Sequence, residues 1–162
     1  MLLLASCKSE PKTYTYQDVS FTYPASFKIE DEDIDDYSAI LTLTKDEDNF
    51  MIIHIVPDDA LLLLDRSDVQ ESIEQDALDL LMLDVDDEDM DVDADSVSAM
   101  SSPEGSAPGV LLMYNATSFG EPVKGRISIT VQRQYQIRLK YEANNDKALN
   151  EMTDIATSFN VE

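Results

Sequence analysis

The sequence predicts an α+β domain: a mostly antiparallel β-sheet flanked by two main helices. Two observations carry the prediction. Apolar and polar residues alternate within residues 14–56 and again within 110–141, as in strands. Apolar residues recur at helical spacing over residues 68–83 and near the C-terminus. Strands, a helix, more strands and a closing helix, without an internal repeat, are typical of a layered α+β sandwich.

The first strands follow from period-2 patterning. Residues 14–23 alternate around a polar pair and end at Pro24, which predicts a hairpin. Residues 37–43 alternate again, and residues 50–56 are apolar on both faces, as expected for a central strand covered on both sides. Residues 30–36 carry six acids in seven positions, which we interpret as a solvated loop.

Each helix has a start signal. Ser67 and Gln70 have the spacing of a capping box, so a helix is predicted over residues 68–83. Asn144 or Asn145 is expected to cap the closing helix. The apolar stripes of the two helices are Val69, Ile73, Ala77, Leu80 and Leu81, and then Ala148, Met152, Ile155, Ala156 and Phe159.

Composition limits the function. The chain of 162 residues is about one domain long, and 34 acidic against 11 basic residues give a net charge of −23. Such a charge opposes binding to nucleic-acid phosphate through a general basic face. One Cys makes no intramolecular disulfide, and one His makes no histidine-rich metal site. No nucleic-acid partner and no cofactor are expected.

The chemistry of catalysis is also missing from the sequence pattern. His54 lies in an apolar strand, and we interpret it as a sheet-face histidine with a satisfied hydrogen bond. No nucleophile elbow, zinc-protease helix, phosphate loop or dinucleotide fingerprint accompanies it. The protein is therefore predicted not to be an enzyme.

Residues 84–95 carry eight acids in twelve positions, which raises the question of calcium binding. Asp84, Asp86 and Glu88 are the weak candidate ligands. In an EF-hand register the sixth position is Asp89 instead of Gly, and the twelfth is Asp95 instead of Glu. We therefore predict no specific metal site and a solvated acidic loop at about 84–95 that is little ordered.

Residues 1–13 are interpreted as a signal remnant, a lipobox and a tether ahead of a single domain at 14–162. The run from Leu4 to Cys7 (Leu-Ala-Ser-Cys) resembles the lipobox of bacterial lipoproteins, although the apolar stretch before it is short and lacks a basic start. The resemblance implies lipid attachment and a membrane anchor at Cys7, and Lys8 after it implies the outer membrane. The alternative is a cytosolic chain with a chance match.

Two segments carry a family resemblance. Residues 21–27 (Phe-Thr-Tyr-Pro-Ala-Ser-Phe) and the closing residues 155–159 (Ile-Ala-Thr-Ser-Phe) resemble motifs of PsbP-like domains, a family named for an extrinsic subunit of photosystem II. Phe27 stands where the family usually has Trp. The resemblance covers about residues 14–160. It implies an αβα sandwich used mostly for protein association, and no photosynthetic role follows from it.

The closing hairpin is the predicted contact surface. Residues 124–140 hold five of the eleven basic residues and no acid. Period-2 geometry is expected to send Arg126, Arg138 and Lys140 outward beside Lys124, forming a face for an acidic protein partner. The alternative is that the run at 84–95 folds over this face and neutralises it.

These observations together predict a non-enzymatic lipoprotein of the bacterial cell envelope that serves as a protein- or ligand-binding accessory module. The alternative is an acidic envelope protein that binds calcium or is adapted to salt.

Overall fold

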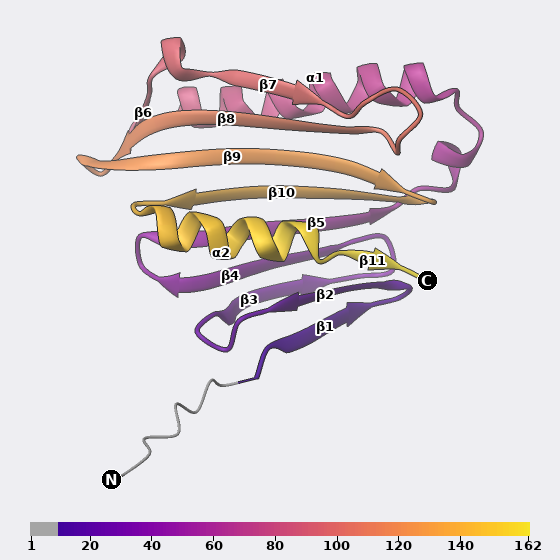
Figure 1. The fold of residues 1–162 in the computed structure, drawn as a ribbon, viewed down its shortest axis with the longest axis horizontal. Coiled ribbons are helices and arrows are strands. Elements are labelled where there is room, and N and C mark those ends of the chain that lie inside the picture. The colour runs from indigo at the N-terminus through magenta and orange to yellow at the C-terminus, as the bar shows by residue number, and fades with distance from the viewer. Residues whose placement is uncertain (1–9) are drawn as a thin grey trace, which may run out of the picture.

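The structure is a computed structural model, and it describes residues 10–162. Its strands and helices are β1 (Lys12–Tyr16), β2 (Val19–Tyr23), β3 (Lys28–Ile34), β4 (Ala39–Asp46), β5 (Asn49–Pro57), α1 (Arg66–Val85), β6 (Met90–Val92), β7 (Ser98–Ser101), β8 (Gly109–Ser118), β9 (Glu121–Gln132), β10 (Tyr135–Ala143), α2 (Asp146–Thr157) and β11 (Asn160–Val161). Figure 1 shows the main sheet running across the molecule with one helix on each side.

The main sheet is antiparallel and has the strand order β3-β4-β5-β10-β9-β8-β6, with β7 also paired to β8. A second, three-stranded sheet has the order β1-β2-β11. The fold class predicted from the sequence is confirmed: a mostly antiparallel sheet lies between two main helices. No helix within residues 10–162 is both long and apolar enough to cross a membrane.

The two helices lie on opposite faces because of the register between β9 and β10. Ile129 pairs with Arg138, so the apolar side chains of β9 and those of β10 point to opposite faces of the sheet. The apolar face of β9 packs with β8 under α1. The apolar face of β10 packs with β4, β5, β2 and α2. The sheet therefore separates two apolar cores.

The helix starts follow the sequence signals only in part. Asn145 caps α2 as predicted, because its side chain accepts from the amide of Ala148 at 2.9 Å. Helix α1 begins at Arg66 with Asp65 as its N-cap, so the predicted capping box is not formed. The Gln70 amide instead donates to the carbonyl of Gly109 in β8 at 2.9 Å. A tertiary contact has replaced the local one.

The two acidic runs are more ordered than predicted. Most of the expected loop at 30–36 is the edge strand β3. Asp84 of the expected loop at 84–95 lies in the last turn of α1, and β6 occupies residues 90–92. Pairing with β4 and with β8 supplies backbone hydrogen bonds that charge patterning along the chain does not reveal.

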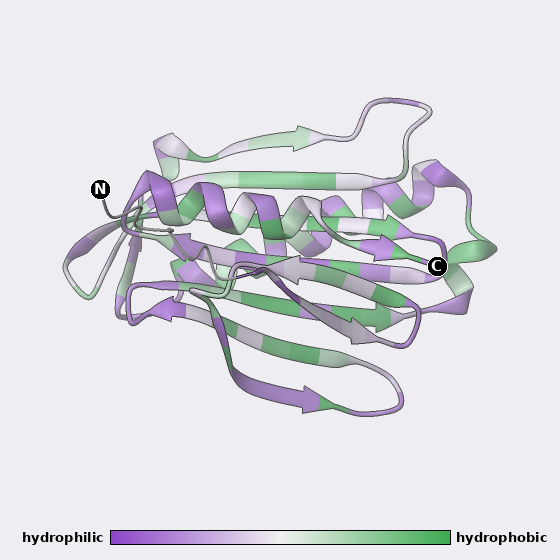
Figure 2. Cartoon of the chain, turned by 60° about the horizontal axis from the view of Figure 1, so that its bottom comes forward, coloured by the Kyte–Doolittle hydropathy of each residue, from purple (hydrophilic) through white to green (hydrophobic). Residues whose placement is uncertain are grey.

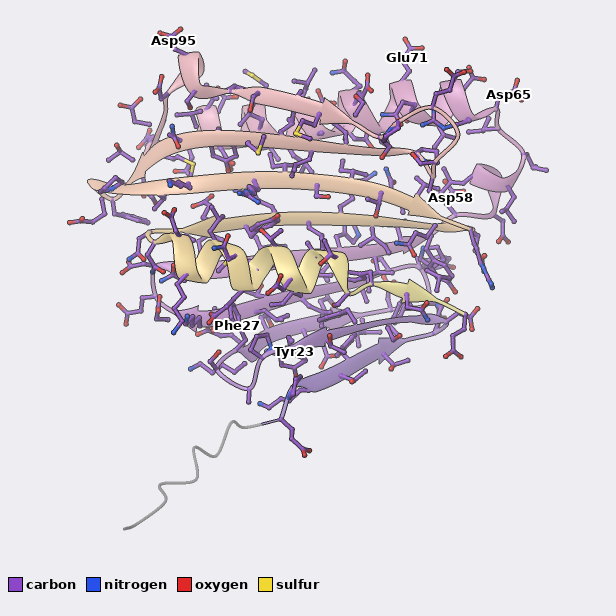
Figure 3. All side chains as sticks on the ribbon, in the orientation of Figure 1. Tyr23, Phe27, Asp58, Asp65, Glu71 and Asp95 are labelled. Carbon is purple, nitrogen blue, oxygen red and sulfur yellow. The ribbon has the colours of Figure 1, made fainter. Side chains whose placement is uncertain are left out.

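The two segments that resemble PsbP-like domains pack against each other. The rings of Phe21 and Phe159 stack with their centroids 4.7 Å apart. The hydroxyl of Ser158 accepts from the Thr22 amide at 3.0 Å and donates to the Thr22 carbonyl at 3.1 Å. Phe27 is fully buried in the same core, on the α2 side of the main sheet (Figure 3).

Candidate functional site

The α1 side of the main sheet is only partly covered. Helix α1 lies over β8 and β9, whereas β4 and β5 have no helix above them on this face. A cavity of about 280 Å³ opens between the flank of α1 and these strands. We call this cavity the groove, and its walls are Ile40, Ile52, His54, Leu80, Leu83, Arg138, Leu139 and Lys140.

The walls of the groove are mainly apolar. Ile40 of β4 is 39% exposed, and Ile52 of β5, which pairs with Thr42, is half-buried. Leu80 and Leu83 face them from α1, and Leu83 is 68% exposed. The exposed apolar surface of these side chains is unfavourable in water. A ligand that covers it gains about 25 cal/mol for each Å² removed from water.

Basic side chains lie at the base of the groove. Arg138 donates from Nη2 to Asp76 Oδ2 of α1 at 2.8 Å and to the side-chain Oε1 of Gln136 at 2.9 Å. His54 is half-buried on β5 directly opposite Arg138 of β10. Burial, and then the positive charge of Arg138, lower the pKa of His54 below its ordinary value of 6.5. His54 therefore takes up a proton less readily than an exposed histidine.

His54 was predicted to have a satisfied hydrogen bond. Within residues 10–162 no hydrogen bond to its ring is present, and His54 lines the groove. No Ser, Thr or Cys lines the groove beside it. His54 is thus one of the polar side chains that line the groove.

A buried polar cluster lies under the C-terminal turn of α1. Tyr114 of β8 donates to Asp84 Oδ2 at 2.7 Å, and Lys140 forms an ion pair with Asp84 Oδ1. Lys140 Nζ also lies 3.6 Å from Glu142 Oε1, an oxygen that is buried without a hydrogen-bond partner. Burial raises the pKa of Glu142 above its ordinary value of 4.5, and Lys140 opposes this rise.

Gly125 allows this cluster to form. The Tyr114 ring crosses β9 at Gly125, and a Cβ added there would lie 2.1 Å from Tyr114 Cζ. Any larger residue would therefore displace the ring that reaches Asp84. The cluster fixes the last turn of α1 against the sheet and so positions Leu80 and Leu83 along the groove.

The four basic residues predicted to form one outward face do not share a face. Because Ile129 pairs with Arg138, Arg138 and Lys140 point to the α1 side, whereas Lys124 and Arg126 point to the α2 side. The assumption that the apolar residues of β9 and β10 share one core was wrong. Arg138 and Lys140 border the groove instead.

Lys124 and Arg126 meet helix α2. Lys124 Nζ lies 2.6 Å from Asp146 Oδ1, and Arg126 donates from Nη1 to the Thr153 hydroxyl at 2.9 Å. The Lys124 pair is exposed, whereas Arg126 is half-buried. All four basic side chains therefore contact side chains of the same chain. One of these, Asp84, belongs to the acidic run at 84–95 that the alternative prediction placed over the basic face.

The candidate metal ligands do not form a site. Asp84 is paired with Lys140, and Asp86 and Glu88 are exposed residues after α1. No group of three or more His, Cys, Asp or Glu side chains suited to a metal ion exists within residues 10–162. The predicted lipid-attachment residue, Cys7, lies outside the described residues.

No protein-family model and no curated protein matches the chain. Solved structures do match. The cyanobacterial PsbP protein CyanoP from Synechocystis sp. PCC 6803 superposes with a TM-score of 0.58 at 16% identity, over 98% of this chain and 99% of CyanoP. The chain has a PsbP-like fold. A protein from Bacteroides thetaiotaomicron VPI-5482 superposes with a TM-score of 0.52 at 11% identity, over 93% of this chain and 48% of its own.

The groove of this PsbP-like domain was not predicted from the sequence, although one signal pointed to it. Gln132 pairs with Tyr135, so only two residues connect β9 and β10. A two-residue loop pairs odd-numbered with even-numbered positions, which places Arg138 beside Ile129. That register alone puts Arg138 and Lys140 on the face of α1.

Proposed function

We propose that the protein is a non-catalytic binding module of the bacterial cell envelope, anchored by lipid at Cys7, whose groove takes up an amphipathic ligand with an apolar body and an anionic group. The observation that carries this proposal is the groove itself: exposed leucine and isoleucine side chains stand beside Arg138 and Lys140 in a chain of net charge −23. The PsbP-like fold supports the accessory role.

The ligand chemistry follows from the two kinds of wall. Ile40, Ile52 and Leu83 offer apolar area to a hydrocarbon or aromatic body. Arg138 and Lys140 are only partly exposed, with 31% and 23% of their side chains accessible, so an anionic group beside them is partly shielded from water. A charge interaction is stronger in such a place than on the open surface.

Two dyes that share one aromatic body test the proposal. 1-Anilinonaphthalene-8-sulfonate carries an anionic sulfonate, and N-phenyl-1-naphthylamine has the same ring system without it. We expect the sulfonate dye to bind with one site per chain and more tightly than the neutral dye, despite the net charge of the protein. Equal affinity, or tighter binding of the neutral dye, would contradict the anionic component.

A matched pair of variants locates the binding site. Leu83→Asn alters the groove, and Leu78→Asn alters the other flank of α1, where Leu78 is also exposed. If a ligand covers about 50 Å² of Leu83, the loss is about 1.3 kcal/mol, or roughly tenfold in affinity. We expect that loss for Leu83→Asn alone. Similar affinities of the two variants would place the dye elsewhere.

The anchor is tested separately. We expect labelled palmitate to be incorporated into the wild-type protein in a bacterial host and to be lost in Cys7→Ala, which moves the protein from the membrane to the soluble fraction. Three acyl chains would hold it firmly, since each buried methylene contributes about 0.8 kcal/mol. Labelling that persists in Cys7→Ala would refute the anchor and leave the groove unaffected.

A further inference from the structure

The two edges of the main sheet differ in charge. At one edge, β3 carries Glu30, Asp31, Glu32 and Asp33, and a register shift beside Glu30 interrupts its pairing with β4. Charges and bulges of this kind prevent another strand from pairing with an edge. At the opposite edge, β7 consists of Ser98, Ala99, Met100 and Ser101 and has no charge. Figure 2 shows β3 strongly hydrophilic at the bottom and β7 neutral to apolar at the top.

Strand β7 has backbone groups directed away from the sheet. Beyond its end, the Ser102 amide donates to the Gly109 carbonyl of β8 at 2.8 Å. Antiparallel strands alternate inward-bonding and outward-facing residues, so Ala99 and Ser101 direct their N–H and C=O groups away from β8. Within residues 10–162 neither amide has a hydrogen-bond partner. All four residues of β7 are exposed.

Apolar side chains flank this edge on both faces of the sheet. On the α1 face, Glu74 accepts from the Ser101 hydroxyl at 2.6 Å, which places that flank of α1 beside β7. Leu78 and Met82 continue the same flank at steps of four residues and are 47% and 52% exposed. On the other face, Met100 is 59% exposed. A strand added beside β7 would therefore have apolar neighbours above and below.

Acidic residues surround the uncharged edge. Asp93 and Asp95 lie in the chain before β7, and Glu104 lies after it. Figure 3 shows Asp95 and Glu71 along the same border of the molecule. A segment that pairs with β7 is thus favoured if basic residues flank it. A second copy of this chain, at net charge −23 and with the same acids, is disfavoured.

From these observations we infer that β7 is a docking edge for an extended segment of a partner protein, with apolar residues at its centre and basic residues at both ends. The segment adds a strand to the main sheet through the backbone groups of Ala99 and Ser101. This site is separate from the groove, which lies on the opposite flank of α1, and it goes beyond the proposed function.

The probe is acetyl-Lys-Lys-Val-Thr-Val-Thr-Lys-Lys-amide. Its controls are the same peptide with Glu for each Lys, and one with alternate backbone nitrogens methylated so that they cannot pair. Affinity is measured by fluorescence anisotropy, and hydrogen exchange is measured by NMR. We expect the basic peptide to bind and to slow exchange at Ala99 and Ser101 at least tenfold. No protection of these amides at millimolar peptide would overturn the inference, as would equal binding of either control.

Variants make the test specific to the edge. Ala99→Pro removes an outward amide that pairs with nothing in the described chain, and Ala99→Ser keeps it. We expect at least tenfold weaker peptide binding for Ala99→Pro and no change for Ala99→Ser. Leu78→Asn, on the helix surface, is expected to weaken binding without disturbing β7, whereas Leu83→Asn leaves it unchanged. Wild-type affinity for the peptide in both Ala99→Pro and Leu78→Asn would refute β7 as the docking edge. Self-association of the protein that protects the amides of Ala99 and Ser101 would refute a partner protein as the occupant of this edge.

Discussion

Replacing Gly125 by Ala tests the packing that holds α1 to the sheet. A Cβ at this position would lie 2.1 Å from Cζ and 2.5 Å from Oη of Tyr114, too close for any real contact. The Tyr114 ring is 3% exposed, so it has little room to move away. We therefore expect the methyl group to displace the ring and to break the hydrogen bond from Tyr114 to Asp84.

The expected magnitude combines two costs. Overpacking a filled core costs about 1–3 kcal/mol. A hydrogen bond lost from the buried Asp84 carboxylate adds about 1–3 kcal/mol. The φ of Gly125 lies outside the left-handed region, so Ala is otherwise compatible with this strand and contributes about 0.4–1 kcal/mol by reducing the entropy of the unfolded chain. The net expectation is a loss of about 1–6 kcal/mol in the free energy of unfolding.

The sign of the effect should reverse when the ring is absent. In the background Tyr114→Ala, the added methyl group enters vacant space, and Gly125→Ala is expected to stabilise the protein slightly. Urea unfolding at pH 7, followed by circular dichroism, measures both arms of this double-mutant cycle. A loss below about 1 kcal/mol in the wild-type background, or the same loss in both backgrounds, would refute the close approach as its cause.

Three further expectations concern the charged groups. Glu142→Gln should raise the free energy of unfolding at pH 7–8 and flatten its pH dependence. The folded protein keeps a proton on Glu142 above pH 4.5 that the unfolded chain has lost, so the stability of the wild-type protein falls as the pH rises above 4.5. Urea titrations at several pH values measure this change. Lys140→Met should cost about 3–5 kcal/mol in the same assay, because it leaves the buried Asp84 carboxylate without its cation. Lys124→Met, which removes the exposed pair with Asp146, should leave the urea midpoint unchanged, and a clear shift would contradict its assignment as a surface contact.

The elements were more predictable than their arrangement. Alternation and helical spacing located α1, α2 and the closing hairpin, because burial of one face leaves its period in the chain. Alternation with a period of two residues shows which side chains of one strand lie on the same face. It does not show which residues of the neighbouring strand lie on that face of the sheet. The apolar residues of β9 and β10 were therefore assigned to one core, whereas the pairing of Ile129 with Arg138 puts them in two.

The charged residues show a second limit of sequence reasoning. Asp84 stands at the start of an acidic run and was assigned to a solvated loop. It is 3% exposed because Tyr114 and Lys140, 30 and 56 residues further along the chain, supply its partners. The groove depends on the same kind of information, since its walls come from β4, β5, β10 and α1. The pattern of charges along the chain does not show which residues far apart in the sequence come into contact.

The small sheet has a consequence for how the chain acquires its structure. Strand β11 pairs with β2, and the Thr22 backbone bonds with Ser158, a residue 136 positions away. Such contacts close the longest loops and are slow to form, since the entropy of closure precedes any gain. During synthesis, β1 and β2 are made before β11, so their three-stranded sheet cannot be completed until residues 160–161 are available. The hairpin of β1 and β2 therefore gains its third strand only after the main sheet and α2 have been synthesised.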